Sequence, residues 1–209
     1  MPLQNRIDPW GQLNADIARG SWMGNRGILH DEKKEIVAPW RHKSWVTCRL
    51  SFQSYKREIF SQNNYSELFF LDEATAFSAG HRPCAECRRD RFNEFKLAWC
   101  KANPDRISSN LVSIKEIDTQ LHIDRATLGK QKNTYRARFQ DLPEGTFIDI
   151  EGKAHLLWNK HLYLWSFSGY TKISLIIKPS TEVTVLTPHS IINMLHQGFT
   201  PQVHESVNS

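Results

Sequence analysis

The sequence predicts an α+β fold, in which hairpins and two to three helices are arranged around a Cys-x2-Cys knuckle and are followed by a small antiparallel β meander. Apolar residues recur every three or four positions in residues 88–102 and 113–128, which is the spacing of an amphipathic helix. After Leu142 the pattern changes to short alternating segments between turn residues, which is typical of antiparallel strands. We therefore expect a basic α+β region over residues 1–140, the meander with a short C-terminal helix over residues 141–200, and a flexible tail over residues 201–209.

The N-terminal region is expected to begin with two hairpins. Residues 28–30 and 35–37 flank a charged turn, which predicts the first hairpin. Residues 44–52 alternate apolar and polar side chains and predict a strand with one buried face, with residues 55–60 as its partner.

The remaining elements follow from periodicity and from turn residues. A helix over residues 66–78 is expected to end at Gly80, because glycine is common just after the last turn of a helix. The helix over residues 88–102 is stopped by Asn103-Pro104, and a third helix covers residues 113–128. The meander strands are predicted at residues 146–150, 154–158, 161–165 and 182–186, with a short helix at residues 190–197.

Composition excludes several classes of protein. The chain has 209 residues, of which 40% are hydrophobic, so it is long and apolar enough to bury a core. Four cysteines are too few for a disulfide-dense secreted scaffold. No apolar run approaches the roughly 18 residues of a membrane span, and the start MPLQNRIDPWG lacks the apolar stretch of a signal peptide. We therefore expect a cytoplasmic protein without a membrane partner.

The net charge of +5 is unevenly distributed along the chain. Residues 19–57 hold nine Lys or Arg against three acidic residues, and residues 81–106 hold seven against four. Residues 130–140 hold four basic residues and no acid, whereas residues 58–80 and 141–209 are net acidic. If the three basic blocks converge on one face, that face would attract phosphates; the alternative is a mildly basic, solvated surface.

The most specific local signal is G-H-R-P-C-A-E-C-R-R at residues 80–89. The Cys-x2-Cys spacing of Cys84 and Cys87 lets both sulfurs approach one zinc ion. Arg88 and Arg89 follow at a helix start, where they are expected to lower the pKa of the thiols. The alternatives are a redox-active pair, which usually belongs to a βαβ unit, and a metal-free turn.

This segment also resembles a known zinc domain. Residues 70–90, in which a helix leads into Ala-Gly-His-Arg-Pro-Cys-x2-Cys, are similar to the second half of the zinc-binding domain of Ada alkylation-repair proteins. In that family four cysteines hold zinc, and one zinc-bound thiolate accepts a methyl group from a DNA phosphotriester. The two upstream family cysteines are spaced Cys-x3-Cys, whereas here Cys48 is followed at that spacing by Phe52. The resemblance therefore implies zinc ligation by Cys84 and Cys87, but not methyl transfer.

The sequence does not decide which residues supply the remaining zinc ligands. Cys48 alternates with apolar residues, which favours a core thiol, but its similar position to an upstream family cysteine makes it a candidate ligand. His42 lies near the end of the same expected strand and is a candidate fourth ligand, with His30 and His122 as alternatives. Cys100 would lie about 20 Å along the helix from Cys87, which is too far.

Two groups of polar residues suggest further chemistry. Basic residues around the knuckle and in the alternating segment 130–139 are expected to meet nucleic-acid phosphates, and the alternative is solvated surface. These residues are Arg82, Arg88, Arg89, Lys132, Arg136 and Arg138. A second set combines imidazole, carboxylate, amide and guanidinium groups and suits acid–base work, if it is not simply turn and helix-surface residues. The members of this candidate catalytic set are Asn25, Arg26, His30, Asp118, His122 and Arg125.

The sequence therefore predicts a zinc-stabilised nucleic-acid-binding protein, directed to DNA repair or to the recognition of modified DNA. The alternative is a metal-assisted nuclease or another hydrolase that acts on nucleic acid or nucleotides.

Overall fold

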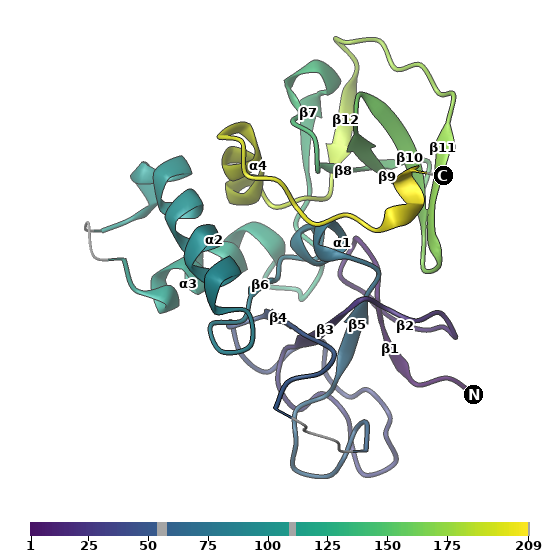
Figure 1. The fold of residues 1–209 in the computed structure, drawn as a ribbon, viewed down its shortest axis with the longest axis vertical. Coiled ribbons are helices and arrows are strands. Elements are labelled where there is room, and N and C mark those ends of the chain that lie inside the picture. The colour runs from purple at the N-terminus through teal and green to yellow at the C-terminus, as the bar shows by residue number, and fades with distance from the viewer. Residues whose placement is uncertain (54–57, 109–111, 209) are drawn as a thin grey trace.

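The computed structural model describes residues 1–53, 58–108 and 112–208. The chain forms two six-stranded sheets and four α-helices, which confirms the α+β class (Figure 1). Residues 55–57 of the expected partner strand at 55–60 lie outside the described residues, and residues 58–60 form no strand. None of the helices in the described ranges is long and apolar enough to span a membrane.

The first sheet is built from short strands of the N-terminal region. Its strands run in the order β2-β1-β5-β3-β4-β6, with parallel pairing of β1 with β5 and of β4 with β6 and antiparallel pairing elsewhere. The strands are β1 (Gln4–Ile7), β2 (Leu13–Ala15), β3 (Trp22–Asn25), β4 (Val46–Cys48), β5 (Leu68–Phe70) and β6 (Arg82–Pro83). The expected hairpin at residues 28–37 is reduced to a single bridge between His30 and Ile36.

The second sheet is the expected meander, extended at both edges. It is antiparallel throughout, in the order β11-β10-β9-β8-β12-β7. Its strands are β7 (Tyr135–Arg138), β8 (Phe147–Ile150), β9 (Lys153–Trp158), β10 (His161–Ser166), β11 (Gly169–Ile173) and β12 (Glu182–Val185). Because β7 pairs with β12, this sheet begins before the expected boundary at residue 140.

Three helices pack against one another and share a core with the second sheet. They are α2 (Arg89–Ala102), α3 (Ile114–Arg125) and α4 (His189–His196), all close to their predicted ranges. Their apolar faces share one core, in which Phe95, Trp99 and Ile117 are fully buried beside Ile148 and Val185 of the sheet. Burial of the repeating apolar face thus explains why periodicity located these helices.

Helix α1 (Glu73–Ser78) lies between the two sheets (Figure 1). All six of its residues are buried, with Ala74 packed in the core of the second sheet and Ala76 in that of the first. The expected helix at 66–78 is therefore wrong in its first half, which is strand β5. Asp72 separates the two elements, because its carboxylate accepts the Thr75 backbone N–H and caps the helix at 2.8 Å.

The C-terminal segment packs onto α1 in place of the expected flexible tail. The backbone N–H of Gln202 donates to Glu73, and that of His204 donates to Asp72. Val207, in the short helix Glu205–Asn208, is buried in the core of the second sheet. These bonds to buried carboxylates hold the segment in place.

Candidate functional site

Three cysteines meet at the edge of the first sheet. Cys48 ends β4, and Cys84 follows β6, the strand that pairs with β4 in parallel. The Cys84 backbone N–H donates to the Thr47 carbonyl at 2.9 Å, which continues the ladder and sets Cys84 beside Cys48. A tight turn then returns Cys87 to the same point, so the three Sγ atoms lie within 4.8 Å of one another. This spacing allows all three sulfurs to bind one metal ion.

The pKa values of the three thiols are strongly coupled. The pKa of Cys84 is lowered to about 5, first because Cys48 donates a hydrogen bond to its sulfur and further because the backbone N–H groups of Cys87 and Glu86 point at it. The hydrogen bond from Cys48 also lowers the pKa of Cys87, while the pKa of Cys48 itself is raised. The thiol pKa values are therefore lowered by hydrogen bonds from Cys48 and from the backbone, and not by Arg88 and Arg89 as the sequence predicts. Two of the sulfurs favour the thiolate, which is the form that binds metals.

Of the four expected ligands, the structure brings together Cys48, Cys84 and Cys87, but not His42. In the described ranges no fourth His, Cys, Asp or Glu joins the cluster. His42 is exposed and lies close to Gly27, and Cys100 packs beside the helical core. The thiols line a cavity of about 500 Å³ together with the exposed Arg49. The protein thus offers three cysteine sulfurs beside an accessible cavity, and two of these sulfurs favour the thiolate.

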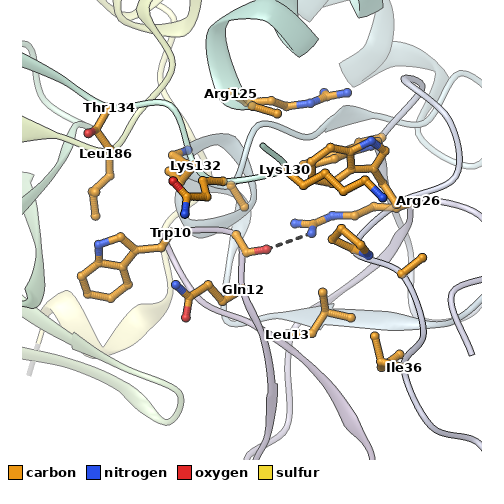
Figure 2. Close-up of a pocket in the computed structure, with 18 of the residues that line it drawn as sticks. Trp10, Gln12, Leu13, Arg26, Ile36, Arg125, Lys130, Lys132, Thr134 and Leu186 are labelled. Carbon is orange, nitrogen blue, oxygen red and sulfur yellow. Dashed lines mark hydrogen bonds between the residues drawn. The ribbon is translucent and has the colours of Figure 1, made fainter. Parts of the chain in front are cut away.

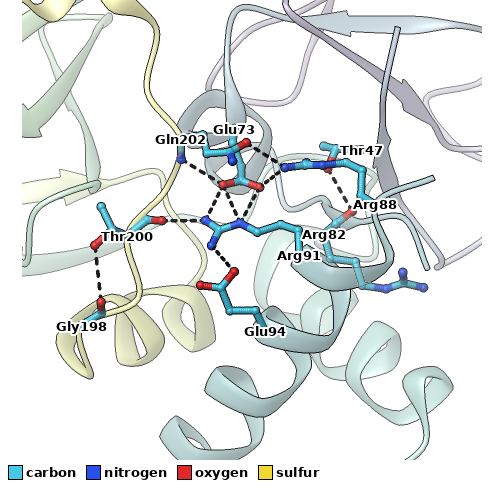
Figure 3. A network of polar contacts seen from close by, with 9 residues as sticks. All are labelled: Thr47, Glu73, Arg82, Arg88, Arg91, Glu94, Gly198, Thr200 and Gln202. Carbon is cyan, nitrogen blue, oxygen red and sulfur yellow. Dashed lines mark hydrogen bonds and ion pairs between the residues drawn. The ribbon is translucent and has the colours of Figure 1, made fainter. Parts of the chain in front are cut away.

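Two of the expected phosphate-binding arginines are committed to buried ion pairs instead. Arg88 donates to Glu73 at 2.6 Å and Arg91 donates to the other Glu73 oxygen at 2.6 Å, as Figure 3 shows. Arg82 forms a two-bond pair with Asp118 at 2.7 and 2.8 Å. These guanidiniums are buried because a carboxylate neutralises each of them, so they are not free for phosphates.

The other basic candidates lie in different places. Arg89 is exposed at the start of α2, two residues after Cys87. Arg136 and Arg138 are exposed on β7, where Arg136 bonds the Glu182 carbonyl and the Thr184 hydroxyl of the neighbouring strand. Lys132 points inward, and its ammonium group donates to the Ser78 carbonyl.

The six candidate catalytic residues do not form one site. The Asn25 amide oxygen accepts the Gly27 backbone N–H, and His30 is buried with its ring stacked on Phe60 and bonded to the Ser66 hydroxyl. Asp118 is bound by Arg82 and Ser44, so it is not the orienting partner expected for His122. The pKa of His122 is lowered to about 4, first by burial and then by Arg125. With a pKa this low, the His122 imidazole is already neutral well below pH 7, so it does not suit proton transfer near pH 7.

Two members of that set, Arg26 and Arg125, do come together. Their guanidinium carbons lie 4.0 and 3.8 Å from the centre of the Trp45 ring, so both arginines stack on the same indole. Lys132 and the fully buried His81 complete a cluster of cations and imidazole. Figure 2 shows Arg26, Arg125 and Lys132 around a cavity of about 780 Å³ between the two sheets.

Local backbone structure explains this convergence. After α1, the Gly80 N–H bonds the Phe77 carbonyl and the His81 N–H bonds the Ala76 carbonyl, which is a Schellman motif with Gly80 at φ +85°. His81 is thereby turned inward, where its Nε2 atom accepts from Arg26 at 3.1 Å. Arg125 lies across Gly80 and donates to its carbonyl.

The buried imidazole of His81 makes stability sensitive to acid. Its pKa is lowered well below 6.5, first by burial and then by Arg26, Arg125 and Lys132. Below pH 6.5, His81 therefore binds a proton in the unfolded chain but not in the native protein. The free energy of unfolding should fall as the pH drops below about 6.5, because protonation stabilises only the unfolded chain. Urea unfolding between pH 7.5 and 5.5 should show a smaller loss of stability for His81→Gln than for the wild type. The exposed His196→Gln on α4 is the control, and equal losses in all three proteins would contradict the role of His81.

With this geometry in view, the chain was compared with known proteins. No protein-family model, curated protein or solved structure matches it. The resemblance of residues 70–90 to the Ada zinc domain therefore stays a prediction, and function has to be argued from the chain's own residues.

The sequence does not single out Trp45 or Arg49, and it offers His81 only as a possible zinc ligand three residues before Cys84. One usable signal is the alternation of residues 44–52, which places Trp45 and Cys48 on opposite faces of one strand. The two faces correspond to the two candidate sites, the thiol cluster and the cationic cavity.

Proposed function

We propose that this protein binds zinc through Cys48, Cys84 and Cys87, and that the zinc-stabilised region binds nucleic acid, with DNA as the main partner. The observation that carries the proposal is the triangle of sulfurs within 4.8 Å. Thiolate ligands favour zinc over harder cations such as magnesium or calcium. Because the ligating thiols come from two separate segments, bound zinc would tie β4 to the turn before α2.

Positive charge beside the thiols supports the nucleic-acid partner. Arg49 and Arg89 are exposed next to Cys48 and Cys87 and have no carboxylate within ion-pair distance among the described residues. Exposed arginines with mobile side chains can follow a phosphate backbone without reading the sequence of bases. The second sheet offers less support, since Arg136 already bonds the neighbouring strand β12.

Metal analysis of the purified protein tests the first half of the proposal. We expect about one zinc per chain in the wild type and a loss of most of it in Cys48→Ser and Cys84→Ser, because each variant leaves only two thiolates. Cys100→Ser is the matched control, since Cys100 lies outside the cluster. Equal zinc in the wild type and Cys84→Ser would overturn the metal assignment.

Binding to duplex and single-stranded DNA tests the second half. If the protein contacts three phosphates, raising the salt concentration from 50 to 300 mM should weaken binding about a hundredfold. Arg89→Gln should reduce the slope of log affinity against log salt by about one, whereas Lys172→Gln, at an exposed position of β11, should leave it unchanged. Affinity that does not depend on salt would count against a phosphate-binding surface.

A second candidate is a metal-assisted nuclease or other hydrolase. It is favoured by one observation, that the described residues supply three ligands and not four. Zinc with three protein ligands and one open position is typical of sites that activate water. A screen of DNA, RNA and nucleotides for turnover by the zinc-loaded protein separates the two functions. Binding without turnover would favour the first.

A further inference from the structure

Two buried arginines and one half-buried lysine lie between the two sheets without a paired carboxylate among the described residues. Arg26 and Arg125 are 1% and 2% exposed, and the half-buried Lys132 lines the same cavity. Within the part of the chain that the structure describes, none of the three has a carboxylate within ion-pair distance. A buried charge is costly unless it is paired, so this arrangement differs from the neutralised Arg82 and Arg88.

The carboxylates nearest to the cavity are already engaged. Asp8 accepts from the Gln12 backbone and the Asn14 amide, and Asp124 is paired with Arg106 at 2.6 Å. Asp149, on the rim of the cavity, accepts from the indole of Trp10 and the backbone N–H of Gly152. These groups reduce the positive potential in the cavity but do not neutralise it.

Unused hydrogen-bond donors accompany the unpaired charge. Among the described residues, Arg26 Nη2 and Arg125 Nε are buried without any acceptor. Buried donors of charged groups are rarely left unpaired in folded proteins. Both the charges and the donors would be satisfied by a small anion with several oxygens, as guanidinium groups bind phosphate oxygens well.

The cavity is larger than an inorganic anion requires. Its volume of about 780 Å³ is within the range of small-molecule sites, and its lining adds Trp10 and Trp40 to the polar Gln12 and Thr134. An organic group attached to the anion can therefore lie against the indoles.

We propose that this cavity binds a phosphate monoester, with the phosphoryl group held by Arg26, Arg125 and Lys132. Two sources share this chemistry, a small phosphorylated molecule such as a nucleotide and the terminal phosphate of a nucleic-acid strand. The site lies apart from the thiols and does not rest on zinc binding, so either assignment can fail while the other holds.

Sulfate is the first probe, because it remains a dianion from pH 6 to 8. At constant ionic strength, sulfate should raise the melting temperature of the wild type and bind measurably by calorimetry. Lys132→Met should weaken the binding at least tenfold at pH 6, whereas Lys172→Met on β11 should not change it. Absence of sulfate binding, or equal binding by the wild type and Lys132→Met, would overturn the proposal.

The pH dependence of sulfate binding gives a second, independent readout. The pKa of Lys132 is lowered to about 7, first by burial and then by Arg26 and Arg125, with Asp8 acting in the opposite direction. His81, whose pKa is lowered well below 6.5, stays neutral over this range, and the pKa of Arg26, lowered to about 9, keeps it charged. Sulfate affinity should therefore fall about tenfold from pH 6 to pH 8 as Lys132 loses its proton. In Lys132→Met this fall should disappear, and its persistence would contradict the role of Lys132.

Competition with sulfate identifies the source of the phosphate. Adenosine 5′-monophosphate should displace sulfate while adenosine does not, if the ligand is a small molecule. A 5′-phosphorylated oligonucleotide that competes where its 5′-hydroxyl form does not would assign the site to a strand terminus. Failure of every phosphate monoester to compete would overturn the assignment to phosphate.

Discussion

Replacing Glu73 with Gln is expected to lower the free energy of unfolding by about 3–5 kcal/mol, which is the usual cost of removing one partner from a buried ion pair. Glu73 is fully buried and is the shared acceptor of Arg88 and Arg91, each at 2.6 Å. It also accepts the backbone N–H of Gln202 from the C-terminal segment. The isosteric amide keeps the volume but leaves the nearly buried Arg88 without a counter-charge. Urea unfolding at pH 7 measures this loss.

A matched control is available on the same arginine. Glu94 also pairs with Arg91, at 2.8 Å, but its side chain is 61% exposed. Glu94→Gln should therefore cost less than about 1 kcal/mol, because water screens an exposed pair. Similar losses in the two variants would mean that burial does not determine the strength of this network.

The Glu73 network also explains how the thiol cluster is held. Arg88 follows Cys87 directly, and its guanidinium joins Glu73 of α1 to the Thr47 hydroxyl of β4, as Figure 3 shows. The turn that carries Cys84 and Cys87 is thus fixed against the strand that carries Cys48. Arg88, which the sequence predicts to meet phosphates, instead positions the candidate metal ligands.

Sequence patterns located the elements whose stability is local. The helices α2, α3 and α4 and the hairpin-connected strands β8, β9 and β10 bury a repeating apolar face or pair with their neighbours in the chain. The first sheet is different, because strands of two to four residues pair across long separations, such as β1 with β5. Such strands are too short to show a period, and Phe69 and Phe70 of β5 fit a helical pattern equally well.

The candidate sites could also be predicted only where their residues are close together in the sequence. Cys84 and Cys87 form a local motif, whereas Cys48 reaches them only through the parallel pairing of β4 with β6, which no local pattern encodes. Net charge located the basic blocks but could not distinguish the exposed Arg89 from Arg82, which is neutralised by Asp118. The cationic cluster includes His81, whose inward turn follows from the end of α1.

Gly80→Ala should disrupt the cationic cavity and lower the free energy of unfolding by about 2–5 kcal/mol. A left-handed backbone costs a non-glycine residue about 1–2 kcal/mol, and overpacking adds about 1–3 kcal/mol. A Cβ atom at Gly80 would lie 2.4 Å from Arg125 Cδ, so the arginine stem has to move. This movement should withdraw the guanidinium from Trp45 and weaken sulfate binding at least tenfold.

Gly152→Ala separates the steric effect from the backbone effect. Gly152 has a similar φ of +74°, but a Cβ atom there would meet nothing within 4 Å. It should therefore show only the backbone cost of about 1–2 kcal/mol and unchanged sulfate affinity. Denaturant midpoints and sulfate calorimetry on both variants provide the comparison. If Gly80→Ala loses no more stability than Gly152→Ala and still binds sulfate normally, then close packing of Arg125 across Gly80 does not form the cavity. The anion would then have to be held by Arg26 and Lys132 alone.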